Sequence, residues 1–429
     1  MNDRNASYVR GQMLAAKSPP SNAIGPIKWM RENLFDGVIS VFLTLGALAV
    51  IVWIVASLAP WVSNSIWNAG SLTECREILQ GESGACWGVI RDRLPQLIFG
   101  FYPPEIYWRP VLALVLLVAA VSPILFPSVP RKMFWMSLAF PGIGYWLLWG
   151  GSMWFPVSIY AGAVIGALLF SVGSRFNLIV AVGLALAGAV FWWLELAAPA
   201  AVFVGGIMPV EILAVTSRDF GGFLISLTIG VTGIVLSLPL GILLALGRRS
   251  DMILIKTVSV VFIEFIRGVP LITLLFTASL LLNYFLPPGT TFDLILRVII
   301  MVTLFATAYM AEVIRGGLAA LPRGQYEAAD ALGLDYWKAQ QLIIMPQALK
   351  ISIPGIVNTF IGLFKDTTLV VFIGLLDPIG LASAIRANSD WQGIYWELFI
   401  FIGAVFWVFC FGMSRYSMYL EHRLKTDHR

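Results

Sequence analysis

Residues 315–354 read RGGLAALPRGQYEAADALGLDYWKAQQLIIMPQALKISIP, a polar segment that separates two long apolar runs. Connections between neighbouring helices usually need only two to eight residues. Gln325 to Leu332 consists of helix-forming residues with small alanines on one side, and Gly333 supplies a stop. The segment therefore predicts a short helix whose small-residue face can lie close against another protein surface.

The composition predicts that lipid solvates much of this chain. Of its 429 residues, 59% are hydrophobic and only 12% are charged, whereas soluble domains carry about 25% charged residues. Disorder is excluded because it requires low hydrophobicity and high charge. A soluble multidomain enzyme is excluded because so few charges cannot cover its surface.

Ten apolar runs are long enough, or nearly so, to cross a membrane. They lie at about 38–61, 107–126, 133–152, 156–172, 177–197, 223–247, 268–286, 292–314, 355–376 and 394–414. We therefore expect an all-α integral membrane protein with about ten transmembrane helices. The expected parts are a tail at 1–37, an extension of about five helices at 38–221 with a loop at 63–105, five further helices at 222–420 that include the segment 315–354, and a tail at 421–429.

The distribution of basic residues predicts the orientation. With ten spans, the loops that share a side with both termini hold 20 Lys and Arg, and the opposite side holds seven. Because cytoplasmic loops are enriched in Lys and Arg, we place both termini and the segment 315–354 in the cytoplasm. The loop 63–105 then lies on the opposite side of the membrane.

At the segment 315–354 the sequence resembles a known family. EAADALG at 327–333, followed after nine residues by IIMP at 343–346, is similar to the EAA signature of ABC importer permeases, with Met345 where Leu is usual. That substitution preserves volume. In the family this loop docks as a coupling helix on an ATPase subunit. The residues that the resemblance assigns to this coupling are Gly324, Glu327, Ala328, Ala329, Gly333, Ile343 and Pro346.

The flanking sequence resembles the polar amino-acid permeases, the histidine/glutamine/arginine/opine type. EFIRGVPL at 264–271, AYMAE at 308–312 and KDTTL at 365–369 carry this likeness, which extends over about 222–420. It implies that the C-terminal five helices form a type I ABC importer core, which is the MetI-like fold. The long N-terminal extension resembles the larger general L-amino-acid permeases, which pair with a second, similar permease.

This resemblance implies a subunit that moves polar L-amino acids with the help of partners. They are a second permease subunit in a heterodimer, cytoplasmic ATP-binding subunits, a periplasmic amino-acid-binding protein and membrane lipid. The resemblance also implies that the membrane is a bacterial inner membrane, which the chain crosses several times, and that the loop 63–105 is periplasmic. The chain has no G-x-x-x-x-G-K-[ST] phosphate loop, so we expect no enzymatic activity of its own. The residues suggest no cofactor, no metal site, no catalytic residue and no nucleic-acid partner.

Among the charged residues within or near the ends of the expected spans, we single out six: Glu264, Arg267, Glu312, Arg315, Lys365 and Asp366. The spacing of three predicts the pairs Glu264 with Arg267 and Glu312 with Arg315. These pairs are either structural or position the elements that join the coupling helix to the pore. Lys365 and Asp366 are expected about ten residues into a span, as a gate or a contact with another helix, or with the lysine reaching a helix end.

Cys75 and Cys86 lie in the expected outside loop, where they either form a disulfide or remain free thiols. Gly162 and Gly166 form a G-x-x-x-G pair that permits close helix approach. An ion-driven secondary transporter is the alternative function, and it gives the segment 315–354 no role. A membrane enzyme is a further rival, but both histidines lie in the C-terminal tail, at His422 and His428, where they cannot complete a catalytic cluster.

Overall fold

The computed structural model describes residues 25–126, 128–281, 284 and 293–424. Parts of the two expected tails, 1–24 and 425–429, lie outside the described residues, as does His428. The chain divides into one unit of residues 1–69 and 73–87 and another of residues 70–72 and 88–429. The domain boundary expected at 221/222 lies inside the second unit.

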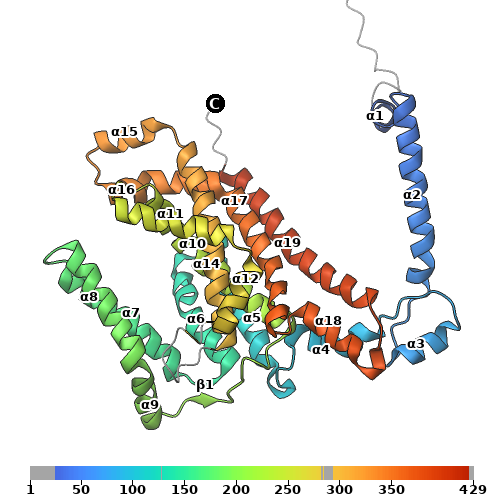
Figure 1. The fold of residues 1–429 in the computed structure, drawn as a ribbon, viewed down its shortest axis with the longest axis horizontal. Helices are drawn as coiled ribbons and strands as arrows, with labels where there is room; N and C mark the ends of the chain where they lie inside the picture. The colour runs from blue at the N-terminus through green and yellow to red at the C-terminus, as the bar shows by residue number, and fades with distance from the viewer. Residues whose placement is uncertain (1–24, 127, 282–283, 285–292, 425–429) are drawn as a thin grey trace, which may run out of the picture. The chain divides into compact units, whose positions relative to one another are not determined.

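The first unit contains a long apolar helix and a disulfide-closed loop. Its helices are α1 (Pro26–Asn33), α2 (Val38–Ser63) and α3 (Leu72–Leu79) (Figure 1). The α2 helix is 26 residues long with a mean hydropathy of 2.8, so it is long and apolar enough to span a bilayer. Cys75, which is buried, forms a disulfide with Cys86, and their Cα atoms are 6.2 Å apart.

The N-terminal part of the second unit consists of helices joined by short breaks. Its elements are α4 (Gly88–Phe99), η2 (Pro104–Ile106), α5 (Trp108–Leu125), η3 (Arg131–Met133), α6 (Phe134–Trp149), β1 (Gly151–Ser152), α7 (Trp154–Gly173), α8 (Leu178–Phe191), the π-helical η4 (Trp192–Leu196), α9 (Ala197–Ile207) and β2 (Glu211–Ile212). The strands β1 and β2 pair antiparallel. About half of the expected outside loop 63–105 is helical, because α3 and α4 lie within it.

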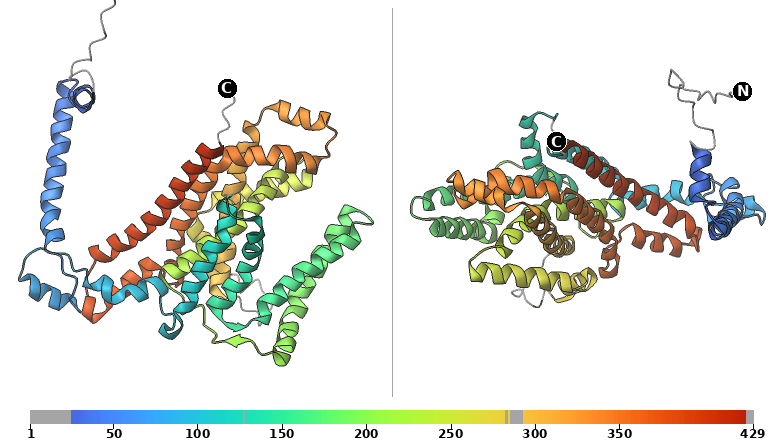
Figure 2. Two further views of the ribbon diagram at one scale, coloured as in Figure 1. Left: turned by 180° about the vertical axis from the view of Figure 1, so that it is seen from behind. Right: turned by 90° about the horizontal axis from the view of Figure 1, so that it is seen from above.

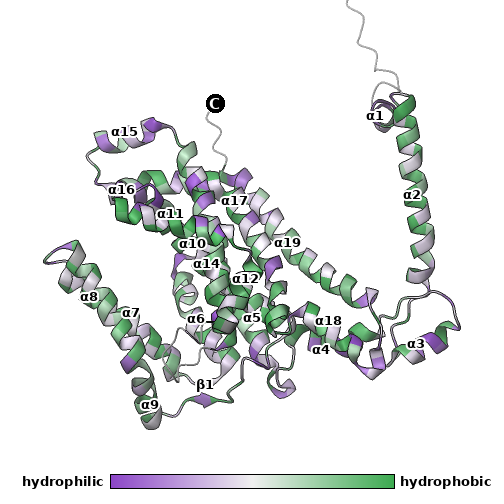
Figure 3. Cartoon of the chain, viewed as in Figure 1, coloured by the Kyte–Doolittle hydropathy of each residue, from purple (hydrophilic) through white to green (hydrophobic). Residues whose placement is uncertain are grey.

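The C-terminal part contains the helices that flank the segment 315–354. Its elements are α10 (Gly222–Arg248), α11 (Ile253–Gly268), α12 (Leu271–Phe276), η5 (Thr277–Leu281), α14 (Leu294–Ala320), α15 (Arg323–Ala331), α16 (Tyr336–Ala339), η6 (Gln340–Ile344), α17 (Met345–Asp366), η7 (Thr367–Ile373), α18 (Pro378–Ala387), η8 (Ser389–Trp391) and α19 (Trp396–Leu424). Figure 3 shows apolar colour along the long helices and hydrophilic colour on α15.

The structure confirms an all-α membrane protein and refines the number of spans. Among the described residues, eight helices are long and apolar enough to cross a bilayer, or nine if α11 and α12, which meet at a 102° bend, count as one broken span. The remaining expected span is α6, whose 16 residues extend about 24 Å. Part of the expected span 268–286 lies outside the described residues.

The core lies between α10, α14 and α17. Ile225, Ile229 and Val302 are buried in it. Where the helices approach most closely, glycines stand in place of larger residues. A Cβ at Gly241 of α10 would collide with Met310 of α14, and a Cβ at Gly317 would collide with Ser352 of α17. Small residues at these positions therefore set the close approach of the three helices.

Candidate functional site: the coupling segment and its ion-pair network

The polar segment forms a helical excursion shorter than its sequence suggested. The α14 helix continues to Ala320 and α17 begins at Met345, so residues 321–344 alone lie between the two long helices. We call these residues the coupling segment. It consists of α15, a turn, α16 and the π-helical η6 (Figure 1). At its C-terminal end, α16 and η6 continue directly into α17, and at its N-terminal end only the extended residues Leu321 and Pro322 separate α14 from α15.

Gly333 ends α15 in a Schellman motif. Its φ is +67°, a left-handed conformation that glycine adopts without strain. The Leu334 N–H donates to the carbonyl of Ala329 at 3.2 Å, and the Gly333 N–H donates to that of Asp330 at 2.9 Å. These two bonds satisfy carbonyls that the helix end would otherwise leave unpaired. Gly333 therefore sets the direction in which the chain turns back.

The EAA residues do not share one face. Glu327 and Ala328 are exposed, whereas Ala329 is only 1% exposed and packs against this chain. We expected both alanines to allow close approach of a partner, and for Ala329 that expectation is wrong. Consecutive residues lie about 100° apart on an α-helix, so the two cannot face the same surface.

The remaining predicted coupling residues anchor or border the segment. Gly324 is exposed, and a Cβ there would meet no described atom within 4 Å. Ile343 is partly buried against the apolar cluster that includes Ile314, Leu318 and Ile344. Pro346 lies just after η6 in a continuous helical stretch, and its missing N–H interrupts the helical hydrogen bonds at this junction.

Arg249, which the sequence reading did not single out, connects the end of α10 to the coupling segment. Its guanidinium donates to the hydroxyl of Tyr326 at 2.8 Å and to the carbonyl of Leu318 at 3.2 Å. The Tyr326 hydroxyl also donates to Leu318 at 3.2 Å. A cavity of about 320 Å³, lined in part by Arg249, Tyr326 and Ala329, lies under α15. The Arg248-Arg249 pair at the end of an apolar run was the available signal.

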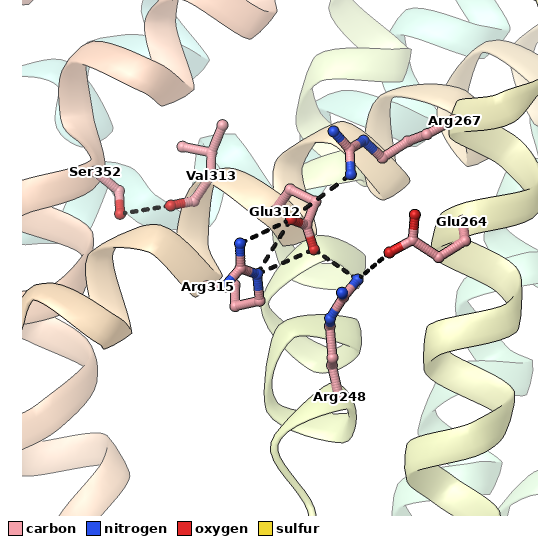
Figure 4. Close-up of polar contacts among 7 residues, drawn as sticks. All are labelled: Arg248, Glu264, Arg267, Glu312, Val313, Arg315 and Ser352. Atoms are coloured by element: carbon pink, nitrogen blue, oxygen red, sulfur yellow. Dashed lines mark hydrogen bonds and ion pairs between the residues drawn. The ribbon is translucent and has the colours of Figure 1, made fainter.

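Glu312 is the centre of an ion-pair network at the base of the segment (Figure 4). Its carboxylate lies 2.8 Å from Arg248 of α10, 3.1 Å from Arg315 of α14 and 3.6 Å from Arg267 of α11. The expected contact between Glu312 and Arg315 is present. The expected pairing of Glu264 with Arg267 is wrong, because Glu264 contacts Arg248 at 2.8 Å instead.

The network joins three helices and leaves one positive charge in excess. Three guanidiniums face two carboxylates, and the Glu312 side chain is 16% exposed while Glu264 is 54% exposed. Charged groups at the end of a membrane helix require partners, and here α10, α11 and α14 supply them to one another. The arrangement therefore fixes these three helix ends relative to the coupling segment.

Lys365 and Asp366 occupy the last turn of α17. We expected them about ten residues into a span that begins near Gly355, and the structure corrects this because α17 begins ten residues earlier, at Met345. Lys365 is exposed and Asp366 is half-buried. They lie at the end of the helix that is distant from the coupling segment.

Asp377 is a second titratable residue that sequence reasoning missed. It caps the N-terminus of α18, accepting from the Gly380 N–H at 2.9 Å and the Ile379 N–H at 3.2 Å. Its side chain is fully buried, and this burial raises the pKa of the Asp377 carboxyl from its ordinary value of 3.8 to about 6. The Asp-Pro pair at 377–378 was a sequence signal for this helix start.

Comparison with known proteins identifies the family. The model described as "binding-protein-dependent transport system inner membrane component" matches residues 237–426. The chain is 58% identical to the glutamate/glutamine/aspartate/asparagine transport system permease protein BztC of Rhodobacter capsulatus, over 99% of this chain and all of that protein. It is 40% identical to the inner membrane amino-acid ABC transporter permease protein YhdY of Escherichia coli, over 94% and 95% of the two chains.

A third relative matches slightly less than half of this chain. The probable glutamine ABC transporter permease protein GlnP of Bacillus subtilis is 31% identical, over 47% of this chain and 91% of its own length. The first two relatives therefore share the N-terminal extension with this chain, and the third matches a stretch of this chain less than half its length. The chain belongs to the family of amino-acid ABC transporter permeases.

Proposed function

We propose that this chain is the permease subunit that carries polar L-amino acids, in particular glutamate, aspartate and their amides, into the cytoplasm across a bacterial inner membrane. The observation that carries the proposal is the 58% identity to BztC over 99% of the chain. A separate ATPase and a periplasmic binding protein complete the transporter, and a second permease subunit forms the pore with this chain in a heterodimer.

The coupling segment is the proposed contact with the ATPase. Glu327 and Ala328 are the exposed members of the EAA motif, so they are the residues available to a partner. Gly324 is also exposed, and Gly333 sets the exit direction of the chain. A movement of α15 then reaches α14 and α17 directly, because both helices begin or end at the coupling segment.

The ion-pair network is the proposed joint that keeps α10, α11 and α14 together during this movement. Glu312 contacts one guanidinium from each of these helices. A ligand or partner can shift a two-state equilibrium only through its differential affinity for the two states. We infer that ATP binding supplies this difference at α15 and that the network transmits it as a unit.

The proposed orientation places both termini and the coupling segment in the cytoplasm. The disulfide between Cys75 and Cys86 supports it, because such bonds persist in the oxidising periplasm. If α11 and α12 cross together as one broken span, they and the five spans α5, α7, α8–α9, α10 and α14 lie between this disulfide and α15. Because only an odd number of crossings reaches the opposite side, we infer that the short α6 crosses as well. Arg109 supports this, since its guanidinium joins the start of α5 to the carbonyl of Leu147 near the end of α6 at 2.8 Å.

Reconstitution of the complete transporter in proteoliposomes tests the proposal. The permease pair, the ATPase and the binding protein are combined, and uptake of labelled glutamate, glutamine, aspartate and asparagine is measured with ATP inside. We expect uptake that requires ATP hydrolysis and the binding protein. Uptake that continues with an inactive ATPase and stops when an ion gradient is collapsed would instead establish the ion-driven alternative.

A further inference from the structure

Glu195 places a carboxyl group at the middle of a membrane span. It is the 16th of 28 residues in the span Val180–Ile207, which α8, η4 and α9 form together. Its side chain is exposed, and no described residue makes a hydrogen bond or an ion pair with it. A charge at the centre of a spanning helix costs about 2.5–3.5 kcal/mol on insertion scales. A group of this kind is therefore expected to have a partner outside the chain.

The local structure holds Glu195 away from the rest of its own hairpin. The indole N–H of Trp192 donates to the carbonyl of Ser158 at 2.8 Å, and that of Trp193 donates to Ile159 at 3.0 Å. One turn later, the Ser158 hydroxyl donates to the carbonyl of Ala197 at 2.8 Å. These bonds fasten one side of η4 to α7, and the two helices of the hairpin run side by side (Figure 2).

The two glycines of the G-x-x-x-G motif already pack against residues of their own hairpin. A Cβ at Gly162 would collide with Trp193, and one at Gly166 would press on α8 at Ala189. The G-x-x-x-G pair therefore serves the packing of α7 on α8 and η4, and it leaves the opposite side of the span open. That side carries large apolar residues next to Glu195, with Leu194 and Val202 both 76% exposed. π-Helical turns such as η4 are frequent at functional sites.

Lipid does not satisfy this carboxyl group, because headgroups lie about 15 Å from the middle of a hydrocarbon core that is about 30 Å thick. A second copy of this chain does not fit either. The basic side chains in the described spans of this chain fall into three groups. Some are buried, such as Arg109 and Arg297, and some belong to the Glu312 network. The others lie near helix ends, such as Lys365. The matching cation must therefore come from a different membrane chain.

We propose that the exposed side of η4 and α9 packs against a transmembrane helix of the second permease subunit, and that a Lys or Arg of that helix pairs with Glu195. This inference rests on the proposed function, which supplies the second permease. The apolar neighbours Leu194 and Val202 provide the packing surface, and Glu195 fixes the register of the two helices. The N-terminal extension then contributes an inter-subunit contact in addition to the pore-forming core.

Photo-crosslinking in native membranes tests this contact. The photoreactive residue benzoylphenylalanine replaces Leu194 in the co-expressed complex, and the adduct is mapped by mass spectrometry. We expect an adduct to the second permease beside a Lys or Arg. Glu195→Arg should reduce its yield at least tenfold, and Glu195→Leu should reduce it less because no repulsion is introduced. Reversing the charge of the mapped basic residue should restore the yield in Glu195→Arg.

The control places the same probe at Leu168 of α7, which is 61% exposed, and Glu195→Arg should leave its adducts unchanged. An adduct to lipid alone, to a second copy of this chain, or one insensitive to Glu195→Arg would overturn the inference. Amino-acid uptake by the unmodified complex is measured in the same membranes. Normal uptake with a lipid adduct refutes the contact alone, whereas absence of uptake refutes the proposed function.

Discussion

Replacing Gly333 by alanine should weaken the turn that ends α15 without removing any packing contact. The φ of Gly333 is +67°, and a Cβ there would meet no described heavy atom within 4 Å. The substitution therefore acts through backbone conformation alone. A left-handed conformation costs an L-residue about 1–2 kcal/mol, and a penalty of about 1 kcal/mol lowers the equilibrium constant for forming the turn roughly fivefold.

The assay is the number of amino acids transported per ATP hydrolysed in proteoliposomes. Gly333→Ala should lower this ratio, by up to roughly fivefold, if the turn must be formed for coupling. Gly333→Asn should be milder, because asparagine tolerates the left-handed region, and Gly333→Val should be more severe because it is β-branched. The ATPase should still bind, since Glu327 and Ala328 remain exposed.

Gly316 provides the matched control. It lies within α14, a Cβ there would also meet no described atom within 4 Å, and its φ is not positive. Gly316→Ala should leave the ratio unchanged, because alanine favours the helix. Equal ratios for wild type and for Gly333→Ala, →Asn and →Val would refute the reasoning, as would an equal loss in Gly316→Ala.

Three further predictions concern the network, the α10 contact and the buried cap. Glu312→Gln leaves three guanidiniums without their shared carboxylate and should destabilise the protein by about 2–3 kcal/mol. Glu264→Gln, at an exposed site, should cost less than about 1 kcal/mol. Thermal unfolding in detergent compares the two variants, and equal effects would contradict the central position of Glu312. Tyr326→Phe removes the acceptor of Arg249 and should lower transport per ATP while the ATPase stays bound, an expectation that unchanged coupling would rule out. Because the pKa of Asp377 is raised to about 6, its contribution to stability is full below pH 3.8 and is lost as the pH rises through 6. Thermal unfolding should therefore show that the protein is less stable at pH 7.5 than at pH 5, by on the order of 1 kcal/mol. Asp377→Asn should abolish this difference in stability, and an equal difference in that variant would reject the assignment.

Hydropathy and spacing predicted the class of fold and the place of the coupling helix. Long apolar runs are a property of the chain itself, and Gly333 marks its turn by composition. The partners of charged side chains depend instead on how helices meet. The spacing of Glu264 and Arg267 permits an ion pair on one helix, but Glu264 pairs instead with Arg248 of α10. Sequence separation alone does not contain that geometry.

Hydropathy also did not predict the residues at which the helices begin and end. Polar residues such as Lys350 are compatible with a helix once it leaves the bilayer, so α17 starts at Met345 and not near Gly355. The position of Lys365 along the helix changes with that start. Similarly, the burial of Ala329 depends on which side of α15 meets the core, and the EAA motif does not state this.

The two-residue junction between α14 and α15 allows α14 to act as a rigid lever. Its 27 residues extend about 40 Å, so a tilt of about 5° at one end moves the other end by about 3.5 Å. At the far end, Arg297 donates to the carbonyl of Ser279 in η5 at 3.0 Å. A small rotation delivered at α15 therefore becomes a displacement on the opposite side of the membrane, which this hydrogen bond passes to η5.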